Sequence, residues 1–321
     1  MKQAEFLPGR RIEIRDVAPP EAAEGEARVR VRGCALCGSD MRLWRNGSSV
    51  TPGHEITGVV EQLGHKLNGR RVVVYIPVFC GTCEACGRGD THLCTTQGAL
   101  IGWQRAGGYA DYLSVPDQCL IPIEDDIETS EAPLLLDVIG TPAHAIRMAR
   151  RIVQSGPVAV IGAGPIGLGG VVAAQNLGFA DISVAEPHAG RRAAALAFDA
   201  RLLAEGADAS RFALVLETSG SNAGRQRALE LTRAHGVCVF LGESDRWEIA
   251  ETKPIRRKDF FVLRSFYFPI SEFDANLAML RADRQRYRRF IDEVAPLEGL
   301  QGMFERFSAG ERIKPQMAPA T

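Results

Sequence analysis

The stretch VAVIGAGPIGL, Val158–Leu168, decides the fold of this chain. Its apolar start, Val158–Ile161, is typical of a buried strand, and an Ala- and Val-rich helical run follows the glycines. In a G-x-G-x-x-G turn the first glycine permits the bend, the second lets the backbone approach a pyrophosphate, and the third lets helix and strand pack closely. Free N–H groups at the helix N-terminus attract the phosphates. The turn therefore predicts a dinucleotide site at Gly162, Gly164, Pro165, Ile166 and Gly167.

A second apolar strand, Ile182–Ala185, ends at Glu186, which lies 24 residues after Gly162. A carboxylate at this place can accept hydrogen bonds from an adenosine ribose and repels a 2′-phosphate, so NAD is expected rather than NADP. Further apolar runs separated by helical segments fit a doubly wound parallel sheet. The alternative is a glycine-rich loop in an unrelated α/β domain. Near the ends of the later strands, two more residues are assigned to the cofactor site, Thr218 and Leu241.

Composition argues against several classes of protein. The chain has 321 residues, enough for two domains, with 45% hydrophobic and 24% charged residues and a formal net charge of −1. This balance gives no sign of a nucleic-acid or membrane surface as partner. Because no apolar run approaches the roughly 20 residues that span a bilayer, and the N-terminus lacks an apolar signal core, we expect a cytoplasmic protein.

Four of the eight cysteines lie within 15 residues, at Cys80, Cys83, Cys86 and Cys94. Such close spacing in a cytoplasmic chain favours metal binding over disulfides. Four thiolates complete a tetrahedral shell with no open position, which predicts a structural zinc site. Three other cysteines stand in apolar or strand-like contexts and are expected to be buried small hydrophobic residues: Cys34, Cys119 and Cys238.

A second group of candidate metal ligands is spread along the chain. Cys37 and His54 are seventeen residues apart, and both residue types bind zinc. Asp40 could orient His54 through the second ring nitrogen. The alternative is a buried cysteine and an unrelated loop histidine. Asp137 stands among leucines, where a carboxylate needs a partner, so it is either a helix-cap or turn residue or a metal ligand.

In their order along the chain, these motifs resemble the zinc-dependent medium-chain alcohol and polyol dehydrogenases, in the sorbitol and threonine dehydrogenase-like branch. The motifs that carry the resemblance are Cys37–Asp40, Gly53–Glu55, the four cysteines, Gly107–Tyr112, the glycine turn and Met303–Gly310. The resemblance implies an α/β protein with a GroES-like, mostly-β catalytic domain (1–140), which carries the structural zinc lobe (80–94). It also implies a doubly wound Rossmann domain that binds NAD (141–268) and a C-terminal return to the catalytic domain (269–321).

The resemblance assigns roles to residues of the expected active site. It implies a catalytic zinc held by Cys37, His54 and Asp137, where Asp137 replaces the glutamate of the polyol branch. Glu55 is a fourth or exchanging ligand in some relatives. Ser39 is expected to hydrogen-bond the reacting alcohol and take its proton. The remaining assignments are Arg42 in place of the usual relay histidine, Thr141 near the nicotinamide and Arg191 on the adenosine side.

The function implied is hydride transfer between NAD and a secondary alcohol of a polyol, sugar or aminocyclitol, with two zinc ions per chain. Glu186-Pro187 followed by Arg191-Arg192 also resembles the 2-deoxy-scyllo-inosamine dehydrogenases. One alternative is the same scaffold with a weak or absent catalytic zinc, acting as a reductase or a redox-neutral enzyme that uses NAD. Another is a non-catalytic NAD-binding sensor. Because relatives are dimers or tetramers, we expect a homodimer or homotetramer.

Overall fold

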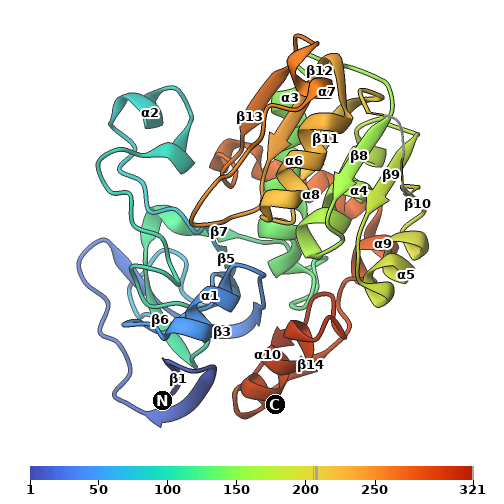
Figure 1. Ribbon diagram of the computed structural model, residues 1–321. Helices are drawn as coiled ribbons and strands as arrows, with labels where there is room; N and C mark the ends of the chain where they lie inside the picture. Colours follow the sequence, from blue (N-terminus) through green and yellow to red (C-terminus); the bar gives the residue numbers. More distant parts are fainter. Residues whose placement is uncertain (205, 207–208, 320–321) are drawn as a thin grey trace. The chain divides into compact units, whose positions relative to one another are not determined.

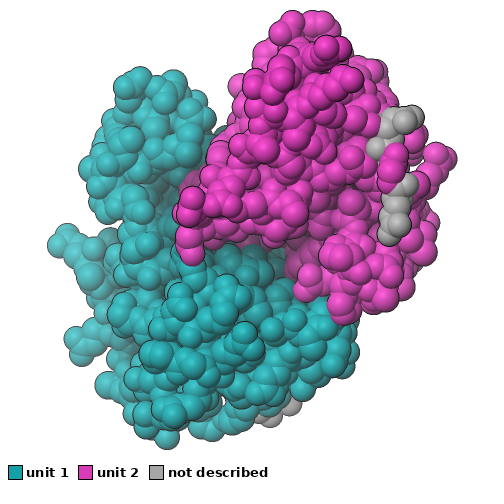
Figure 2. Space-filling model, in the orientation of Figure 1, with its two compact units in different colours: residues 1–136, 269–273, 287–321 teal, residues 137–268, 274–286 magenta. Residues whose placement is uncertain are grey.

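The computed structural model describes residues 1–204, 206 and 209–319 and divides them into two compact units. Unit 1 comprises residues 1–136, 269–273 and 287–321, and unit 2 comprises residues 137–268 and 274–286 (Figure 2). The chain therefore leaves unit 1 after Leu136, returns to it for residues 269–273, and returns again at Tyr287. No helix among the described residues is long and apolar enough to cross a membrane.

Unit 2 is built on a six-stranded sheet in which all neighbouring strands are parallel (Figure 1). The strand order β10-β9-β8-β11-β12-β13 is that of a doubly wound dinucleotide-binding sheet, so the expected Rossmann fold is confirmed. The strands are β8 (Val158–Ile161), β9 (Ile182–Ala185), β10 (Arg201–Leu202), β11 (Phe212–Glu217), β12 (Thr232–Phe240) and β13 (Phe261–Arg264).

The central strands β8 and β11 are buried along their whole length because helices cover parallel sheets on both faces. Every residue of β11 is buried, and so is every residue of β8. The helices are α3 (Thr141–Ala149), α4 (Pro165–Asn176), α5 (Ala189–Ala197), α6 (Asn222–Leu231), α7 (Lys253–Arg256), α8 (Phe273–Ala282) and α9 (Arg284–Arg288). The strand order reverses between β8 and β11, and ligands bind at such a reversal, outside the carboxyl ends of the strands.

Unit 1 is mostly β-structure, as expected of a GroES-like domain. Its main sheet has the order β14-β15-β3-β4-β5-β7, with β6 pairing to β3, and β1 and β2 form a separate antiparallel pair. The strands are β1 (Lys2–Leu7), β2 (Arg11–Asp16), β3 (Glu26–Ala35), β4 (Glu55–Val60), β5 (Arg71–Val74), β6 (Tyr112–Pro116), β7 (Leu120–Pro122), β14 (Val294–Ala295) and β15 (Gln316–Met317). Among the described residues of this unit, the strands are accompanied by three short α-helices: α1 (Asp40–Asn46), α2 (Glu84–Gly87) and α10 (Leu300–Ser308).

The segment around Asp137 combines three kinds of helical turn. A 3₁₀-helix, Ala132–Leu135, leads into a π-helical turn, Leu136–Gly140, and α3 follows directly. π-turns widen the backbone spiral by one residue and are frequent at functional sites. Asp137 therefore lies on an irregular turn at the place where unit 2 begins.

Candidate active site

Strand pairing brings Cys37 and His54 together. Cys37 lies just beyond the end of β3, and His54 immediately precedes β4. The two strands are antiparallel neighbours, with Ala35 opposite Glu55 in the register. The carboxyl end of β3 therefore meets the amino end of β4, and this closes the sequence gap of seventeen residues.

Cys37, His54, Glu55 and Asp137 form one buried cluster whose possible ligand atoms all lie within 4.8 Å of one another. A cysteine thiolate, an imidazole and a carboxylate are ordinary zinc ligands. Crowding two buried carboxylates beside a thiolate is costly unless positive charge compensates them. The cluster thus has the donor atoms that suit a zinc ion.

Asp40 lies behind His54, as expected from the sequence. Its Oδ1 is 3.1 Å from His54 Nδ1, and the carboxylate is fully buried. Its Oδ2 accepts hydrogen bonds from the Cys37 backbone N–H (3.1 Å) and from the Tyr109 hydroxyl (2.9 Å). Asp40 therefore fixes the imidazole and leaves Nε2 as the nitrogen that can face a metal.

Tyr109 supports this arrangement as a neutral hydroxyl. Burial, and then the charge of Asp40, raise the pKa of Tyr109 well above its ordinary value. The ring also stacks on Phe6 with a centroid distance of 5.8 Å.

Lys314 is the residue near the site that sequence reasoning missed. Its Nζ donates to Glu55 Oε1, and both side chains are fully buried. The lysine stands just before β15, which pairs with β3, so the C-terminal segment brings it to the cluster. Its positive charge compensates part of the negative charge that the cluster buries.

Ser39 and Thr141 flank the cluster at the starts of two helices. Ser39 is half-buried at the N-cap of α1, and its carbonyl accepts from the Arg42 N–H at 3.2 Å. Thr141 is the first residue of α3, and its hydroxyl donates to Asp137 Oδ1 at 3.3 Å. This hydrogen bond restrains the Asp137 carboxylate.

The four closely spaced cysteines form a second cluster in a loop of unit 1. The Sγ atoms of Cys80 and Cys86 are 4.0 Å apart, and those of Cys83 and Cys94 are 3.8 Å apart. A tetrahedral site with Zn–S bonds of about 2.3 Å has S···S edges of about 3.8 Å, so the spacing fits zinc. None of the eight cysteines, all among the described residues, forms a disulfide.

Thiolate formation in this loop is helped by donors from its own backbone and side chains. Hydrogen bonds from the Thr82 hydroxyl and N–H lower the pKa of Cys80 to about 5. Burial instead raises the pKa of Cys86 to about 12. A bound dication deprotonates coordinating thiols. Because the pKa of Cys80 is lowered and that of Cys86 is raised, Cys86 depends more on the metal to lose its proton.

In unit 2, the glycine turn has the geometry that its sequence predicts. Gly162 adopts a φ of +96°, in the left-handed region that favours glycine. A Cβ at Gly167 would lie 1.9 Å from the Gly162 carbonyl oxygen, so no larger residue fits there. An added Cβ at Gly164 would meet open space. Pro165 occupies the first turn of α4, and the half-buried Ile166 follows it.

Glu186 lies at the tip of β9, next to the glycine turn. Its Oε2 accepts from the Ala163 N–H at 2.7 Å, and its Oε1 accepts from the His188 N–H at 2.8 Å. The carboxylate is thereby fixed in the position where a ribose diol would donate to it. Arg191 is half-buried in α5, and Arg192 donates to the Glu186 carbonyl oxygen at 3.3 Å.

Thr218 and Leu241 lie at the carboxyl ends of β11 and β12. The Thr218 hydroxyl approaches the carbonyl oxygens of Ile161 and Gly162 at 2.8 and 3.0 Å, which joins β11 to the glycine turn. Leu241 is 7% exposed, and its N–H donates to the Glu217 carbonyl oxygen. Both residues therefore border the edge of the sheet at which the strand order reverses.

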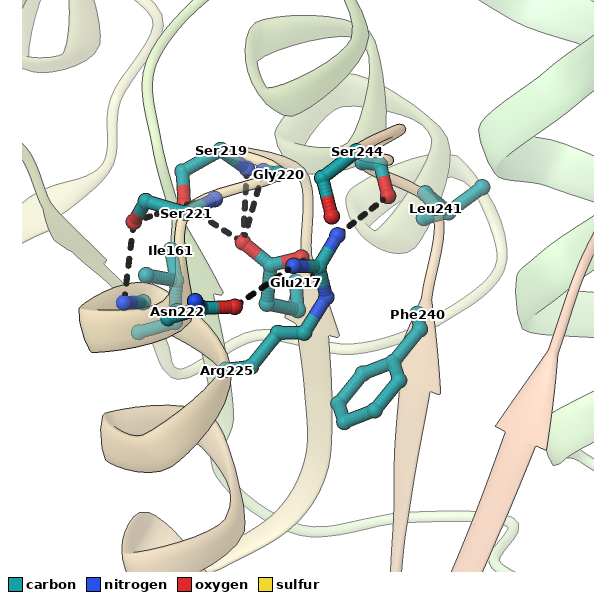
Figure 3. A network of polar contacts seen from close by, with 12 residues as sticks. Ile161, Glu217, Ser219, Gly220, Ser221, Asn222, Arg225, Phe240, Leu241 and Ser244 are labelled. Carbon is teal, nitrogen blue, oxygen red and sulfur yellow. Dashed lines mark hydrogen bonds and ion pairs between the residues drawn. The ribbon is translucent and has the colours of Figure 1, made fainter. Parts of the chain in front are cut away.

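Beside them, a buried ion pair organises the loops that follow β11 and β12 (Figure 3). Arg225 Nε lies 3.9 Å from Glu217 Oε2, and both side chains are fully buried. Glu217 Oε1 accepts from the N–H groups of Ser219 and Gly220, and Arg225 donates to the Gly242 carbonyl oxygen at 3.0 Å. Burial, the largest cause, raises the pKa of Glu217. Sequence reasoning did not single out this pair.

Comparisons with known proteins agree with this arrangement. The sequence model of the alcohol dehydrogenase GroES-like domain matches residues 23–125. The chain is 32% identical to L-galactonate-5-dehydrogenase of Escherichia coli K12 over 247 residues, 70% of each chain. It is 29% identical to an uncharacterized zinc-type alcohol dehydrogenase-like protein of the same organism, over 76% of this chain and 78% of the relative. An alcohol dehydrogenase from Thermus sp. ATN1 superposes with a TM-score of 0.89 at 26% identity and covers both chains completely.

Proposed function

Because the chain belongs to the zinc-dependent medium-chain alcohol and polyol dehydrogenases, we propose that it transfers a hydride between NAD and a secondary alcohol of a polyol, sugar or aminocyclitol. The coarser activity follows from the family: the protein is an NAD(P)-dependent alcohol dehydrogenase that acts on small-molecule alcohols. Its cofactors are zinc and the nicotinamide dinucleotide. The observation that carries the proposal is the buried cluster of Cys37, His54 and Asp137 with Asp40 behind the histidine.

In this proposal Cys37, His54 and Asp137 hold the catalytic zinc, and Cys80, Cys83, Cys86 and Cys94 hold the structural zinc. Zinc bound at the first cluster would act as a Lewis acid and would lower the pKa of an alcohol. Glu55, which is paired with Lys314, is a possible fourth or exchanging ligand. Asp40 keeps the His54 ring in one orientation throughout the reaction.

Proton transfer is assigned to Ser39, at the N-cap of α1. Its hydroxyl can accept the alcohol proton at Oγ while passing its own proton to a neighbouring acceptor. Arg42, at the position of the usual relay histidine, cannot continue this chain because a guanidinium keeps its proton at all accessible pH values. The proton must therefore leave through water or a cofactor hydroxyl.

The preference for NAD over NADP rests on Glu186. Its carboxylate is fixed by two backbone N–H groups and would lie against a 2′-phosphate. The cofactor is proposed to lie along Gly162, Gly164 and Gly167, with its adenosine beside Arg191 and its nicotinamide near Thr218, Leu241 and Thr141.

An oligomer formed through unit 2 also belongs to the proposal. β13 is an edge strand of the described sheet, and Phe261 and Val262 on it are each 47% exposed. An edge strand with exposed apolar side chains is suited to pair with a second copy across a twofold axis. A homodimer is the simplest assembly of this kind.

The test combines metal analysis with turnover. The wild-type protein should contain two zinc ions and form NADH from at least one alcohol in a panel of polyols, sugars, amino alcohols and cyclitols. Cys37→Ala should contain one zinc and lose activity, whereas Cys119→Ala, which removes a buried cysteine outside both clusters, should retain both zinc ions. A protein with one zinc ion and full activity would support the alternative with no catalytic zinc. Cofactor binding without turnover would support the sensor.

A further inference from the structure

A tryptophan and an arginine extend the metal cluster on one side of unit 1. The Trp103 ring lies 5.9 Å from the His54 ring, centroid to centroid, with an interplanar angle of 37°. The guanidinium carbon of Arg42 lies over the same indole, 5.0 Å from its centroid. The distance from the guanidinium carbon of Arg42 to the centroid of the His54 ring therefore cannot exceed the sum of these two distances. The side chains contact one another in succession. The candidate metal ligand His54 lies against Trp103, and Trp103 lies against the cationic Arg42.

The helix that carries Ser39 also directs Arg42 to the same place. Arg42 follows the N-cap Ser39 by three residues, and residues three apart lie on the same face of a helix. Arg42 is exposed, whereas Trp103 is half-buried. The proposed proton acceptor and the cation thus share one face of α1, beside the metal cluster.

Stacking on an indole suits an arginine that binds an anion. The guanidinium is planar and permanently charged, and its five N–H groups lie in the plane, matching the two oxygens of a carboxylate or phosphate. The contact places the guanidinium carbon over the indole ring, as in a cation–π pair. It also restricts the side chain, so less conformational entropy is lost when an anion binds.

We propose that Arg42, supported by Trp103, binds an anionic group of the alcohol substrate, so that the preferred substrates are polyols or sugars that carry a carboxylate or a phosphate. The proposal rests on the proposed function, since it places the reacting hydroxyl at the Cys37–His54 cluster. It also makes a cationic aminocyclitol a poor substrate, because an amine near Arg42 would be repelled. Arg42 is then a specificity-determining residue, and its position explains why the relay histidine is missing.

The test uses four matched compounds: a six-carbon sugar alcohol, its terminal carboxylate, its terminal phosphate and its amino derivative. For the wild-type enzyme, kcat/KM for the better anion should exceed that for the neutral parent roughly 10- to 100-fold, as expected of a hydrogen-bonded charge pair. Comparing carboxylate with phosphate identifies which anion is bound. Arg42→Gln should abolish the preference, and Arg42→Lys should restore part of it, because lysine keeps the charge and loses the planar donors.

Two further variants separate this role from a general change in charge or folding. Arg45→Gln removes the same charge one turn farther along α1 and should change the anion preference by no more than about twofold. Trp103→Leu should reduce the preference about two- to fivefold, the value of an exposed cation–π contact. Zinc content and the melting temperature of each variant establish that the fold and the metal sites are retained.

The outcomes distinguish failure of this inference from failure of the proposed function. Turnover of the neutral or amino compound with an anion preference that Arg42→Gln leaves unchanged would overturn the inference alone. A rise in KM for NAD in Arg42→Gln, without a change in the preference, would assign Arg42 to the cofactor and also overturn it. If no compound is oxidised, calorimetric titration of the four compounds into the zinc-loaded protein with NADH still tests whether Arg42 binds the anionic group. Tighter binding of the anions that depends on Arg42 supports the inference even though the proposed reaction has failed.

Discussion

The two candidate metal clusters are built in opposite ways. The four-cysteine cluster lies in one loop of 15 residues, Cys80 and Cys83 are only half-buried, and its sulfur donors are held by backbone N–H groups of the same loop. The Cys37–His54 cluster collects ligands from three distant places, buries all of them and adds a supporting layer of Asp40, Tyr109 and Lys314. A site that only stabilises a loop needs ligands alone, whereas a site for chemistry needs groups that fix its ligands and balance its charge.

Loss of the structural zinc should have the largest effect on stability. Cys80→Ser removes one of four ligands, and structural zinc in peptides contributes about 10–16 kcal/mol of folding free energy. We expect the variant to lose one zinc ion and at least about 4 kcal/mol of unfolding free energy. Denaturant unfolding with metal analysis measures both. Retention of two zinc ions with unchanged stability would show that the loop does not need its metal.

Removing the buried Lys314 tests the residues that support the Cys37–His54 cluster. Lys314→Met leaves Glu55 buried without its cation, which should cost about 3–5 kcal/mol of unfolding free energy. The double variant Lys314→Met with Glu55→Gln removes both charges and should recover a large part of that loss. Chemical denaturation of the four proteins forms a double-mutant cycle. Additive effects would mean that the pair does not interact as described.

Asp40→Asn should lower the zinc affinity of the catalytic site and leave the zinc affinity of the structural site unchanged. Loss of the carboxylate behind a ligating histidine lowers metal affinity about 10- to 100-fold in comparable sites. Competition with a chelator should therefore remove one zinc ion from the variant at a lower chelator concentration than from the wild type. The matched control is Asp90→Asn, near the four cysteines, which should leave both affinities unchanged. Equal zinc retention in Asp40→Asn would contradict the supporting role.

Lengthening the third ligand, Asp137, should produce the smallest change in zinc affinity and stability. Asp137→Glu restores the methylene found in the polyol branch, and we expect somewhat tighter binding of the catalytic zinc. The competing effect is overpacking in a buried turn, which costs typically about 1–3 kcal/mol. Chelator competition and thermal unfolding separate the two effects. Weaker zinc binding with unchanged stability would mean that the π-turn already places the shorter carboxylate well.

Sequence information was sufficient where the interacting residues are local or where residue types fix the chemistry. The glycine turn and the four cysteines are short motifs whose spacing specifies their geometry, and Asp40 was assigned to His54 because a ligating histidine needs an acceptor on its second nitrogen. Lys314 could not be assigned in this way. It meets Glu55 across 259 positions, and only the pairing of β15 with β3 creates the contact.

The Glu217–Arg225 pair was missed for a different reason. An arginine on a helix surface is normally solvated, and the surrounding sequence of α6 is mostly polar, so nothing marks Arg225 as buried. Its burial follows from the loop after β12, where Trp247 lies over the guanidinium at 5.3 Å. Irregular loops of this kind have no periodic pattern from which such a contact could be predicted.

The late position of Lys314 in the chain has a consequence for biosynthesis. The ligands of the four-cysteine lobe leave the ribosome almost together, so that lobe can bind zinc while translation continues. The Cys37–His54 cluster has no countercharge for Glu55, and β3 has no β15 beside it, until residue 317 has been made. A nascent chain would therefore carry an incomplete Cys37–His54 cluster until residues 316–317 have been made.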